Sequence, residues 1–400
     1  MITSKNQNIN IVFFLILLLF PFIQQRSYGD LPQSIRPIVE GLYKYYSLLS
    51  ATIIYGISLN LQNIIKNRRL LSMIIVFWGI YIISTLFNCP EEIVSVLYRT
   101  YIHIALVLLV IIGCKKWTNE FLSAASIVYG GWIIMTLITS FLFSGGLYKV
   151  NNYHSAHLLG DDNALAYVML PGLVILSVKS MIRKEKIDLL TWGIIILVLL
   201  LLIQLWAASG MISVMMFTFL LFLSRYINII KGKWLFRAFI IVVIITLFGL
   251  SNPYVTNIIE NYIEKEVTLT GRTILWAGAI NMISVQPILG YGGYFKFGLF
   301  SLGRNAEYPC HTPYLQLMID GGLLLFATFF VLVNKAYTCS DKDATNKSGI
   351  ILVAGLFCMM LNYITEHSGL LHFFIITTML FNIDSLKGIE PNGYTSRNRK

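Results

Sequence analysis

Long apolar runs separated by short polar segments form the main pattern of this sequence. Several runs approach or exceed the roughly 20 residues that a helix needs to cross the hydrocarbon core of a bilayer. A soluble chain of this length would instead alternate amphipathic helices or strands around separate cores. The pattern predicts an all-α, polytopic membrane bundle with about 12 transmembrane helices. We place these helices at residues 9–23, 46–61, 70–87, 94–112, 121–143, 164–178, 189–206, 211–223, 238–250, 314–332, 349–363 and 370–381.

Two polar segments on one predicted side of the bundle are long enough to carry function. The first spans residues 144–163. The second, residues 251–313, lies between the ninth and tenth predicted helices and is expected to form a large extracytoplasmic loop. Apolar positions recur at helical spacing within residues 258–263 and again within residues 272–285, and Pro287 follows the second stretch. We therefore expect short helices in this loop, and we place the candidate active site there.

The composition agrees with a membrane protein, because 56% of the 400 residues are hydrophobic and only 12% are charged. We treat residues 1–400 as a single integral membrane domain. The first apolar run is similar to the apolar region of a secretory signal peptide. However, Gln24, Gln25 and Arg26 follow it where a small-residue cleavage site would stand. We expect this run to remain as the first transmembrane helix.

The net charge of +11 is distributed according to the predicted topology. With the N-terminus in the cytoplasm, 21 of the 30 Lys and Arg residues fall in cytoplasmic segments. This bias is the one that membrane insertion favours, so both termini are predicted to be cytoplasmic. The basic excess is explained by orientation in the membrane, and we expect no nucleic-acid partner.

The five cysteines predict no disulfide framework. Cys114 and Cys339 fall in cytoplasmic loops and Cys358 within a helix, so only Cys89 and Cys310 share the predicted outer side. A bond between these two remains one possibility.

Arginine is the side chain best suited to hold a phosphate at the outer face, since its planar fork binds two oxygens at once and stays charged. Arg272, at the start of the second loop helix, and Arg304 are the candidates. Each could instead be an arginine without a ligand, exposed to solvent or to lipid headgroups. Arg99 lies near an outer helix end, and for this residue we favour a structural role in which the side chain extends to the membrane interface.

His311 lies directly before the tenth predicted helix, where Thr312 and Pro313 are expected to act as cap and first-turn residues. A neutral imidazole at this position is suited to act as a general base toward a hydroxyl. The alternative is a loop histidine bonded to a backbone carbonyl.

Three further groups of residues are candidates for a role in the site. Asp320 and Glu366 are acids at outer helix ends, where an acid either has a functional role or joins helices through a contact with Arg or Tyr. The Gly290–Gly293 run is expected to be a turn rather than a phosphate nest. His154, His157, Asp161 and Asp162 lack the organised spacing of a zinc site, so we predict neither a metal nor a cofactor.

Several of these residues stand in one order between residues 271 and 322. The order is Gly271, Arg272 and Trp276, then Pro287, Gly290 and Gly292, then His311, Tyr314 and Leu315, and finally Gly321 and Gly322. It resembles the pattern of the O-antigen polymerase and O-antigen ligase family of bacterial envelopes. Looser matches are the pair Asp162 and Asn163, before an outer helix start, and Glu366 in a late helix.

Two departures from the family pattern affect the interpretation. Where the family has a His-Asn pair, this chain has His311 and Thr312. Ligases usually carry a Ser-Arg pair at the outer start of a middle helix, where this chain has Ser209 and Gly210. The resemblance therefore favours a polymerase over a ligase.

The resemblance implies a metal-independent, inverting glycosyl transfer on the outer face of the cytoplasmic membrane. The substrates would be oligosaccharide repeat units on undecaprenyl pyrophosphate, and the product an O-antigen, capsular or exopolysaccharide chain. His311 and Arg272 would be catalytic, and Arg304, Asp162, Asn163, Glu366 and Tyr314 would bind substrate. Partners would be the lipid bilayer, a chain-length regulator and a flippase.

Two alternative functions remain at this stage. One is ligase-type transfer of polymer to another acceptor. The other is transport of the lipid-linked oligosaccharide, as by a flippase. Transporters tend to contain repeated halves, interrupted helices and ionisable residues at mid-membrane. We find no internal repeat and little charge at the centre of any predicted helix.

Overall fold

The computed structural model describes most of the chain. The described residues are 2–23, 31, 34–61, 68–143, 145–149, 155–161, 164–224, 231–246, 272–293, 297–298, 307–308, 310–341, 346–366 and 369–387. Structural statements below refer to these residues.

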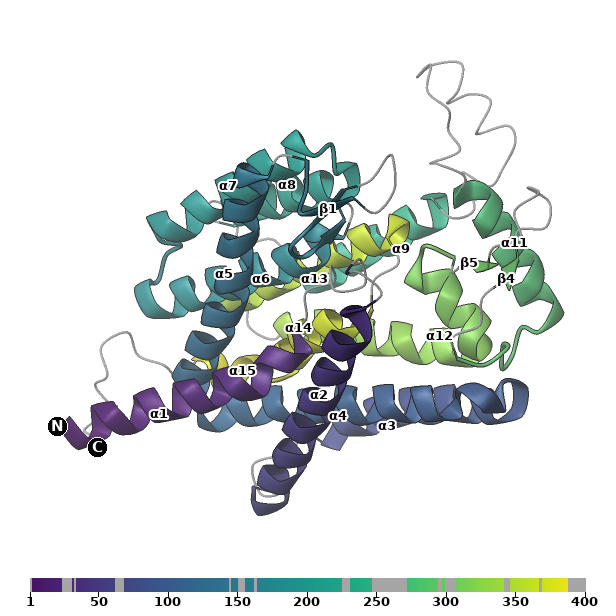
Figure 1. Ribbon diagram of the computed structural model, residues 1–400, viewed down its shortest axis with the longest axis horizontal. Coiled ribbons are helices and arrows are strands. Elements are labelled where there is room, and N and C mark those ends of the chain that lie inside the picture. Colours follow the sequence, from purple (N-terminus) through teal and green to yellow (C-terminus); the bar gives the residue numbers. More distant parts are fainter. Residues whose placement is uncertain are drawn as a thin grey trace.

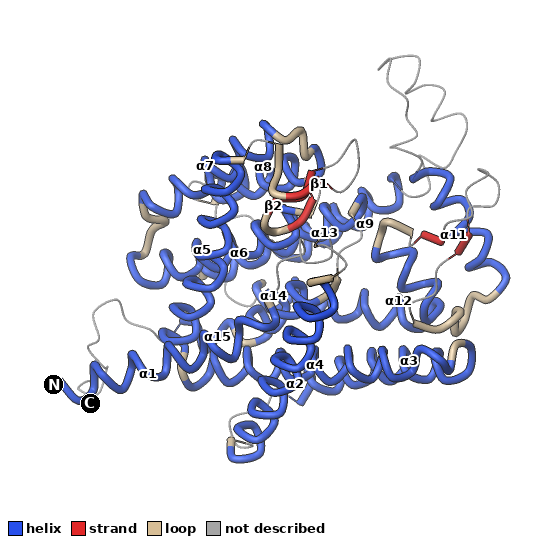
Figure 2. The backbone as a smooth tube through the Cα atoms, viewed as in Figure 1, coloured by secondary structure: helices blue, strands red, loops and turns tan. Residues whose placement is uncertain are grey.

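Helices account for nearly all of the described structure, as Figure 2 shows. The longer ones are α1 (Ile2–Leu19), α2 (Arg36–Asn60), α3 (Arg68–Asn88), α4 (Ile93–Lys116), α5 (Thr118–Leu142), α6 (Leu165–Lys184), α7 (Leu189–Gln204), α8 (Ala208–Leu223), α9 (Gly232–Ile244), α11 (Arg272–Val285), α12 (Pro313–Ser340), α13 (Lys347–Thr365) and α14 (Leu371–Phe381). Three short helices complete them: η1 (Phe20–Phe22), η3 (Pro90–Glu92) and α15 (Ile383–Lys387).

Two small antiparallel sheets lie in the two long loops, and the apolar pattern did not predict them. In the first loop, β1 (Tyr148–Lys149), β2 (Ser155–His157) and β3 (Gly160–Asp161) form a sheet in that order. In the second loop, β4 (Phe297–Gly298) pairs with β5 (Glu307–Tyr308). Each strand is only two or three residues long, too short to give a period-two signal.

Each predicted apolar stretch overlaps a helix, although the boundaries differ. The largest differences are at α2, which begins ten residues earlier than predicted, at α12, which ends eight residues later, and at α1, which begins seven residues earlier. These extensions contain polar or basic residues at helix ends, which hydropathy alone does not detect. The helix expected at residues 272–285 of the large loop is present as α11. The apolar stretch at residues 258–263 lies outside the described residues.

Six helices are long and apolar enough to cross a membrane by length and composition: those of spans Arg69–Asn88, Pro90–Lys116, Thr118–Leu142, Leu165–Lys184, Pro313–Ser340 and Lys347–Thr365. Shorter apolar helices accompany them. Large apolar side chains such as Phe87 on α3 and Phe141 on α5 are exposed on the outside of the bundle. Exposed apolar surface of this extent is unfavourable in water and is the expected surface toward lipid. The chain is a helical protein of the membrane-embedded kind.

The helices pack around α13 and α14, whose residues are almost all buried (Figure 1). Helix α13 contacts α6 and α8, α12 lies beside α3, and α1 packs on α5. Close packing uses small residues: a Cβ added at Gly355 of α13 would lie 2.3 Å from Val174 of α6. Small residues allow helix backbones to approach in a membrane, where apolar burial gives little driving force.

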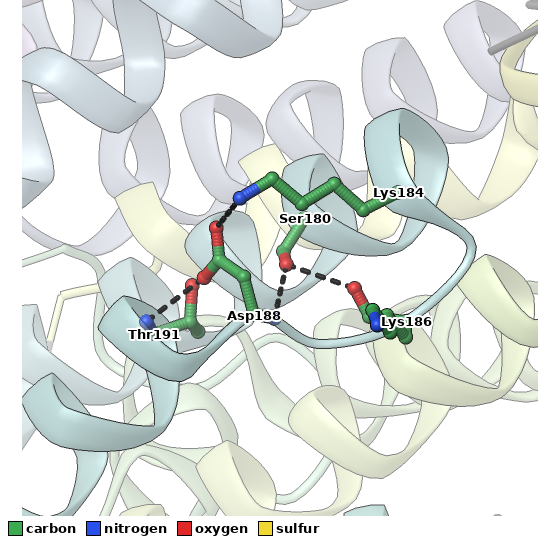
Figure 3. Close-up of polar contacts among 5 residues, drawn as sticks. All are labelled: Ser180, Lys184, Lys186, Asp188 and Thr191. Atoms are coloured by element: carbon green, nitrogen blue, oxygen red, sulfur yellow. Dashed lines mark hydrogen bonds and ion pairs between the residues drawn. The ribbon is translucent and has the colours of Figure 1, made fainter.

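The turn between α6 and α7 is stabilised by polar contacts around Asp188 (Figure 3). The Asp188 carboxylate accepts a hydrogen bond from the Thr191 amide at 2.9 Å and thereby caps α7, and it pairs with Lys184 at 2.9 Å. Partial burial opposes ionisation of this carboxyl, but the bonds from Thr191 and Lys184 outweigh burial and hold the pKa of Asp188 at about 2. The Ser180 hydroxyl accepts a hydrogen bond from the Asp188 amide at 2.7 Å. Connections of this kind fix the antiparallel order of neighbouring helices.

Candidate functional site

His311 directly precedes α12 and has an unusual backbone conformation. Its φ angle of 54° lies in the left-handed region, which side chains other than glycine rarely adopt. The side chain is half-buried. A strained backbone persists only where its surroundings hold it, and such residues gather at functional sites.

Both neighbours of His311 are held by hydrogen bonds from other parts of the fold. The Cys310 amide donates to Gln316 Oε1 at 3.2 Å, and the Cys310 carbonyl accepts from the Trp276 indole at 3.1 Å. On the other side, the Thr312 hydroxyl donates to the Tyr363 carbonyl at 3.1 Å. Helices α11, α12 and α13 therefore jointly fix the backbone on which the imidazole is mounted.

Thr312 and Pro313 occupy the predicted cap and first-turn positions of α12. The prediction that the Thr312 side chain caps the helix is wrong. Its hydroxyl makes no cap hydrogen bond to the helix. It is buried and is used as a donor to α13 instead. The Pro313 ring is consistent with the first helical position, where no amide hydrogen is needed.

Arg272 is the first residue of α11, one helical turn before Trp276. Because the Trp276 indole bonds to the carbonyl next to His311, the start of α11 is tied to the start of α12. The side chain of Arg272 lies outside what the structure describes, and so do Arg304, Asp162, Asn163 and His154.

Glu366 follows the last residue of α13 and is buried. Its Oε1 accepts a hydrogen bond from the Ser209 hydroxyl at 3.2 Å. Ser209 lies in the first turn of α8, where the helix dipole favours a negative charge. The first turn of α8 is thus joined to the end of α13.

Tyr314 is fully buried between α12 and α13. Its hydroxyl donates to the Met360 carbonyl at 2.5 Å. In this position the side chain fastens two helices together, which differs from the substrate contact expected of it.

The ends of five helices meet around these residues. Tyr167, in the first turn of α6, donates to the Gly369 carbonyl at 2.8 Å, just before α14. The Ala164 amide is bonded to Asp161 at 2.9 Å, so the described residues flanking Asp162 and Asn163 belong to the same region. The structure therefore brings together the starts of α6, α8, α12 and α14 and the end of α13. Of the predicted site residues in this region, His311, Tyr314 and Glu366 have described side chains.

The Gly290–Gly293 segment is a turn, as predicted, and it is inserted into a break in α12. Gly322 departs from helical geometry, with φ 65° and ψ −166°. The amides of Tyr291 and Gly292 donate to the carbonyls of Ile319 and Asp320 at 2.6 and 3.0 Å. These amides are engaged within the protein, so they do not form a phosphate nest.

The second half of α12 is bonded to the same turn. Beyond the break, the amide of Leu323 donates to the Pro287 carbonyl at 2.7 Å. An added Cβ at Gly290 would lie 2.2 Å from the Ile319 carbonyl oxygen, and one at Gly322 would lie 2.1 Å from that of Ile288. The Pro-x2-Gly-x-Gly stretch and the later glycine pair are thus two sides of one close backbone contact.

Asp320 lies at this break and is buried. Its carboxylate accepts from the Tyr81 hydroxyl of α3 at 2.8 Å and from Gln316 Nε2 at 2.7 Å. Of the two predicted roles for Asp320, helix packing through Tyr is the one the contacts support. Gln316, Tyr81 and Trp276 were not predicted as members of the site. The i,i+4 spacing of Gln316 and Asp320 is the signal that was available, whereas Tyr81 is too distant in the sequence.

The cysteines and the first-loop histidine have ordinary structural roles. None of the five cysteines, all of which the structure describes, forms a disulfide, and the Cys89 thiol donates to Glu91 at 3.2 Å rather than joining Cys310. His157 is buried, and its Nδ1 lies 3.0 Å from the Ser140 hydroxyl of α5.

Neither a family model nor a curated protein sequence matches this chain.

Proposed function

We propose that this protein polymerises oligosaccharide repeat units carried on undecaprenyl pyrophosphate, on the outer face of the cytoplasmic membrane. The observation that carries the proposal is the position of His311. A left-handed histidine is fixed between three helices, and the helix that begins with Arg272 is bonded to the residue before it. The bond between Trp276 and the Cys310 carbonyl supports assigning Arg272 and His311 to one site.

The reaction requires two tasks from the protein. A hydroxyl of the acceptor repeat unit attacks the anomeric carbon of the donor chain, and the bond from that carbon to the pyrophosphate oxygen breaks with its electron pair leaving on the pyrophosphate. His311 takes the hydroxyl proton as general base. Arg272 and Arg304 stabilise the charge that develops on the leaving group.

The other substrate-binding residues are proposed to hold the acceptor. Glu366, in the region where the five helix ends meet, offers hydrogen-bond acceptors to sugar hydroxyls, and Asp162 and Asn163 are proposed to do the same. The bilayer holds both lipid carriers against the bundle, which lowers the entropic cost of bringing the two substrates into the reactive geometry. A flippase would supply the repeat units, and a chain-length regulator would limit the product.

One observation favours a transporter as the second candidate. Helix α12 is interrupted at Gly322 beside the buried acid Asp320, and interrupted helices with ionisable residues are common in transporters. In transporters the freed backbone groups line a cavity, however, and here the inserted turn at residues 287–292 occupies them. We therefore retain the polymerase as the proposed function.

The test is a deletion of the gene in its host. Cells without the protein are expected to carry single repeat units on the outer-leaflet lipid or on surface acceptors, and no long chains. Membrane fractions would be probed for lipid-linked sugars from each side with an impermeant glycan-oxidising reagent. Repeat units confined to the cytoplasmic leaflet would support the transporter and contradict the polymerase.

A further inference from the structure

The backbone before His311 is the end of a chain of buried hydrogen bonds that begins on a different helix. Tyr81 of α3 donates to Asp320 Oδ2, Gln316 Nε2 donates to Asp320 Oδ1, and Gln316 Oε1 accepts from the Cys310 amide, at 2.8, 2.7 and 3.2 Å. Gln316 and Asp320 are both more than nine-tenths buried. We infer that Gln316, oriented by Asp320, is a positioning residue that holds His311 in its left-handed conformation. This inference rests on the proposed function for its consequence in the reaction.

The chemistry of the chain fixes the orientation of the Gln316 amide. The Cys310 amide only donates, so Gln316 must present its oxygen to it. The glutamine nitrogen is then turned to Asp320 Oδ1, and the Tyr81 hydroxyl donates to Asp320 Oδ2. A change at any one of these groups affects the others.

The chain also explains why a glutamine is needed at this position. A side chain unable to accept would leave the Cys310 amide without its partner in a buried place. The left-handed backbone of His311 would then relax toward an ordinary conformation and displace the imidazole. A displacement of about 1 Å at a reacting group costs on the order of a hundred-fold in rate.

Exchanging the two side chains tests this chain more sharply than removing either. Gln316→Glu places a second acid against Asp320 in a buried site, and both measurements are made at alkaline pH, where the two carboxylates are ionised and repel each other, so that the new side chain withdraws from the Cys310 amide. The exchange variant Gln316→Glu with Asp320→Asn keeps every bond: the new glutamate accepts from Cys310 and from the asparagine amide, and the asparagine oxygen accepts from Tyr81. The number of acids and amides is also unchanged. Gln204→Glu, at the exposed end of α7, is the control for the same chemical change.

The first measurement does not depend on activity. The Cys310 thiol is buried, so its alkylation by N-ethylmaleimide in isolated membranes, quantified by peptide mass spectrometry, reports on the backbone next to His311. We expect alkylation of Cys310 to be several-fold faster in Gln316→Glu, and to return to the wild-type rate in the exchange variant and in Gln204→Glu. Equal protection of Cys310 in all four proteins would overturn the inference. Equal exposure in the single and exchange variants would also overturn it.

The second measurement connects the chain of bonds to the reaction. Membranes would be supplied with lipid-linked repeat units extracted from the deletion strain, and chain formation measured against their concentration. Gln316→Glu should lower the maximum rate about ten- to hundred-fold with little change in the half-saturating concentration, and the exchange variant should recover most of it. An increase in the half-saturating concentration alone would overturn the positioning role. Wild-type membranes that form no chains would contradict the proposed function, and the alkylation pattern would still decide the position of Gln316.

Discussion

His311 combines a functional residue type with a backbone conformation that its own side chain does not favour. Among the described residues, the other left-handed side chains outside glycine are Glu185, which ends α6, and the exposed Trp206 in the turn before α8. Glu185 has the conformation common at a helix end. His311 instead lies at a helix start, and hydrogen bonds from three helices hold its neighbours. Its conformation therefore results from the packing of these helices around the site.

This conformation selects the substitution that best tests the histidine. Asparagine tolerates the left-handed region better than alanine or glutamine and retains hydrogen bonding, but it accepts no proton at neutral pH. We expect His311→Asn to be as abundant in the membrane as wild type and to lose about a hundred- to ten-thousand-fold in rate, the usual contribution of a general base. Glycan length on gels, read beside membrane abundance, measures both. Long chains made by a normally abundant His311→Asn protein would remove His311 from the chemistry.

At the scale of elements, the break in α12 is the feature that arranges the site. In the sequence, Gly290–Gly293 and Gly321–Gly322 are separate features, since the pattern of residues carries no information on long-range contact. In the structure a Cβ at Gly290 would meet the backbone of Ile319 and of the glycine pair, and a Cβ at Gly322 would meet the backbone of Ile288 and Leu289. The apolar pattern identified α12 as a helix because one non-helical residue does not disturb the hydropathy of a span.

We expect Gly322→Ala to destabilise the protein. A Cβ there adopts a positive φ angle and overlaps the Ile288 carbonyl, at a cost of about 1–3 kcal/mol for the backbone strain alone. Gly131→Ala is the matched control, because an added Cβ on that α5 residue meets nothing within 4 Å. The midpoint of thermal unfolding in detergent should fall for Gly322→Ala and stay the same or rise for Gly131→Ala. Equal midpoints would show that the inserted turn does not constrain α12.

At the scale of the whole molecule, the sequence predicted the class of fold better than the site. Apolar runs and polar connections gave the helices, because hydropathy is a local property. The region in which α6, α8, α12, α13 and α14 meet could not be predicted, since pairs such as Ser209 and Glu366 are 157 positions apart. The hydrogen bond between Thr312 and the Tyr363 carbonyl likewise depends on packing between helices.

The orientation in the membrane remains a prediction from the basic residues, and the contacts are compatible with it. The start of α12 lies against the end of α13 through Thr312 and Tyr363, while its other end lies against the start of α9 through Asp341 and Gly232. Segments predicted to face the same side of the membrane are therefore in contact at each end of α12.

We propose that this chain joins lipid-linked repeat units without another protein. The most direct measurement is made with purified protein reconstituted into liposomes together with undecaprenyl-pyrophosphate-linked repeat units from the deletion strain, without other proteins or metal. We expect chains of two or more units and an equivalent release of undecaprenyl pyrophosphate from wild-type protein, and neither from His311→Asn. Movement of repeat units between the leaflets without chain formation would contradict it.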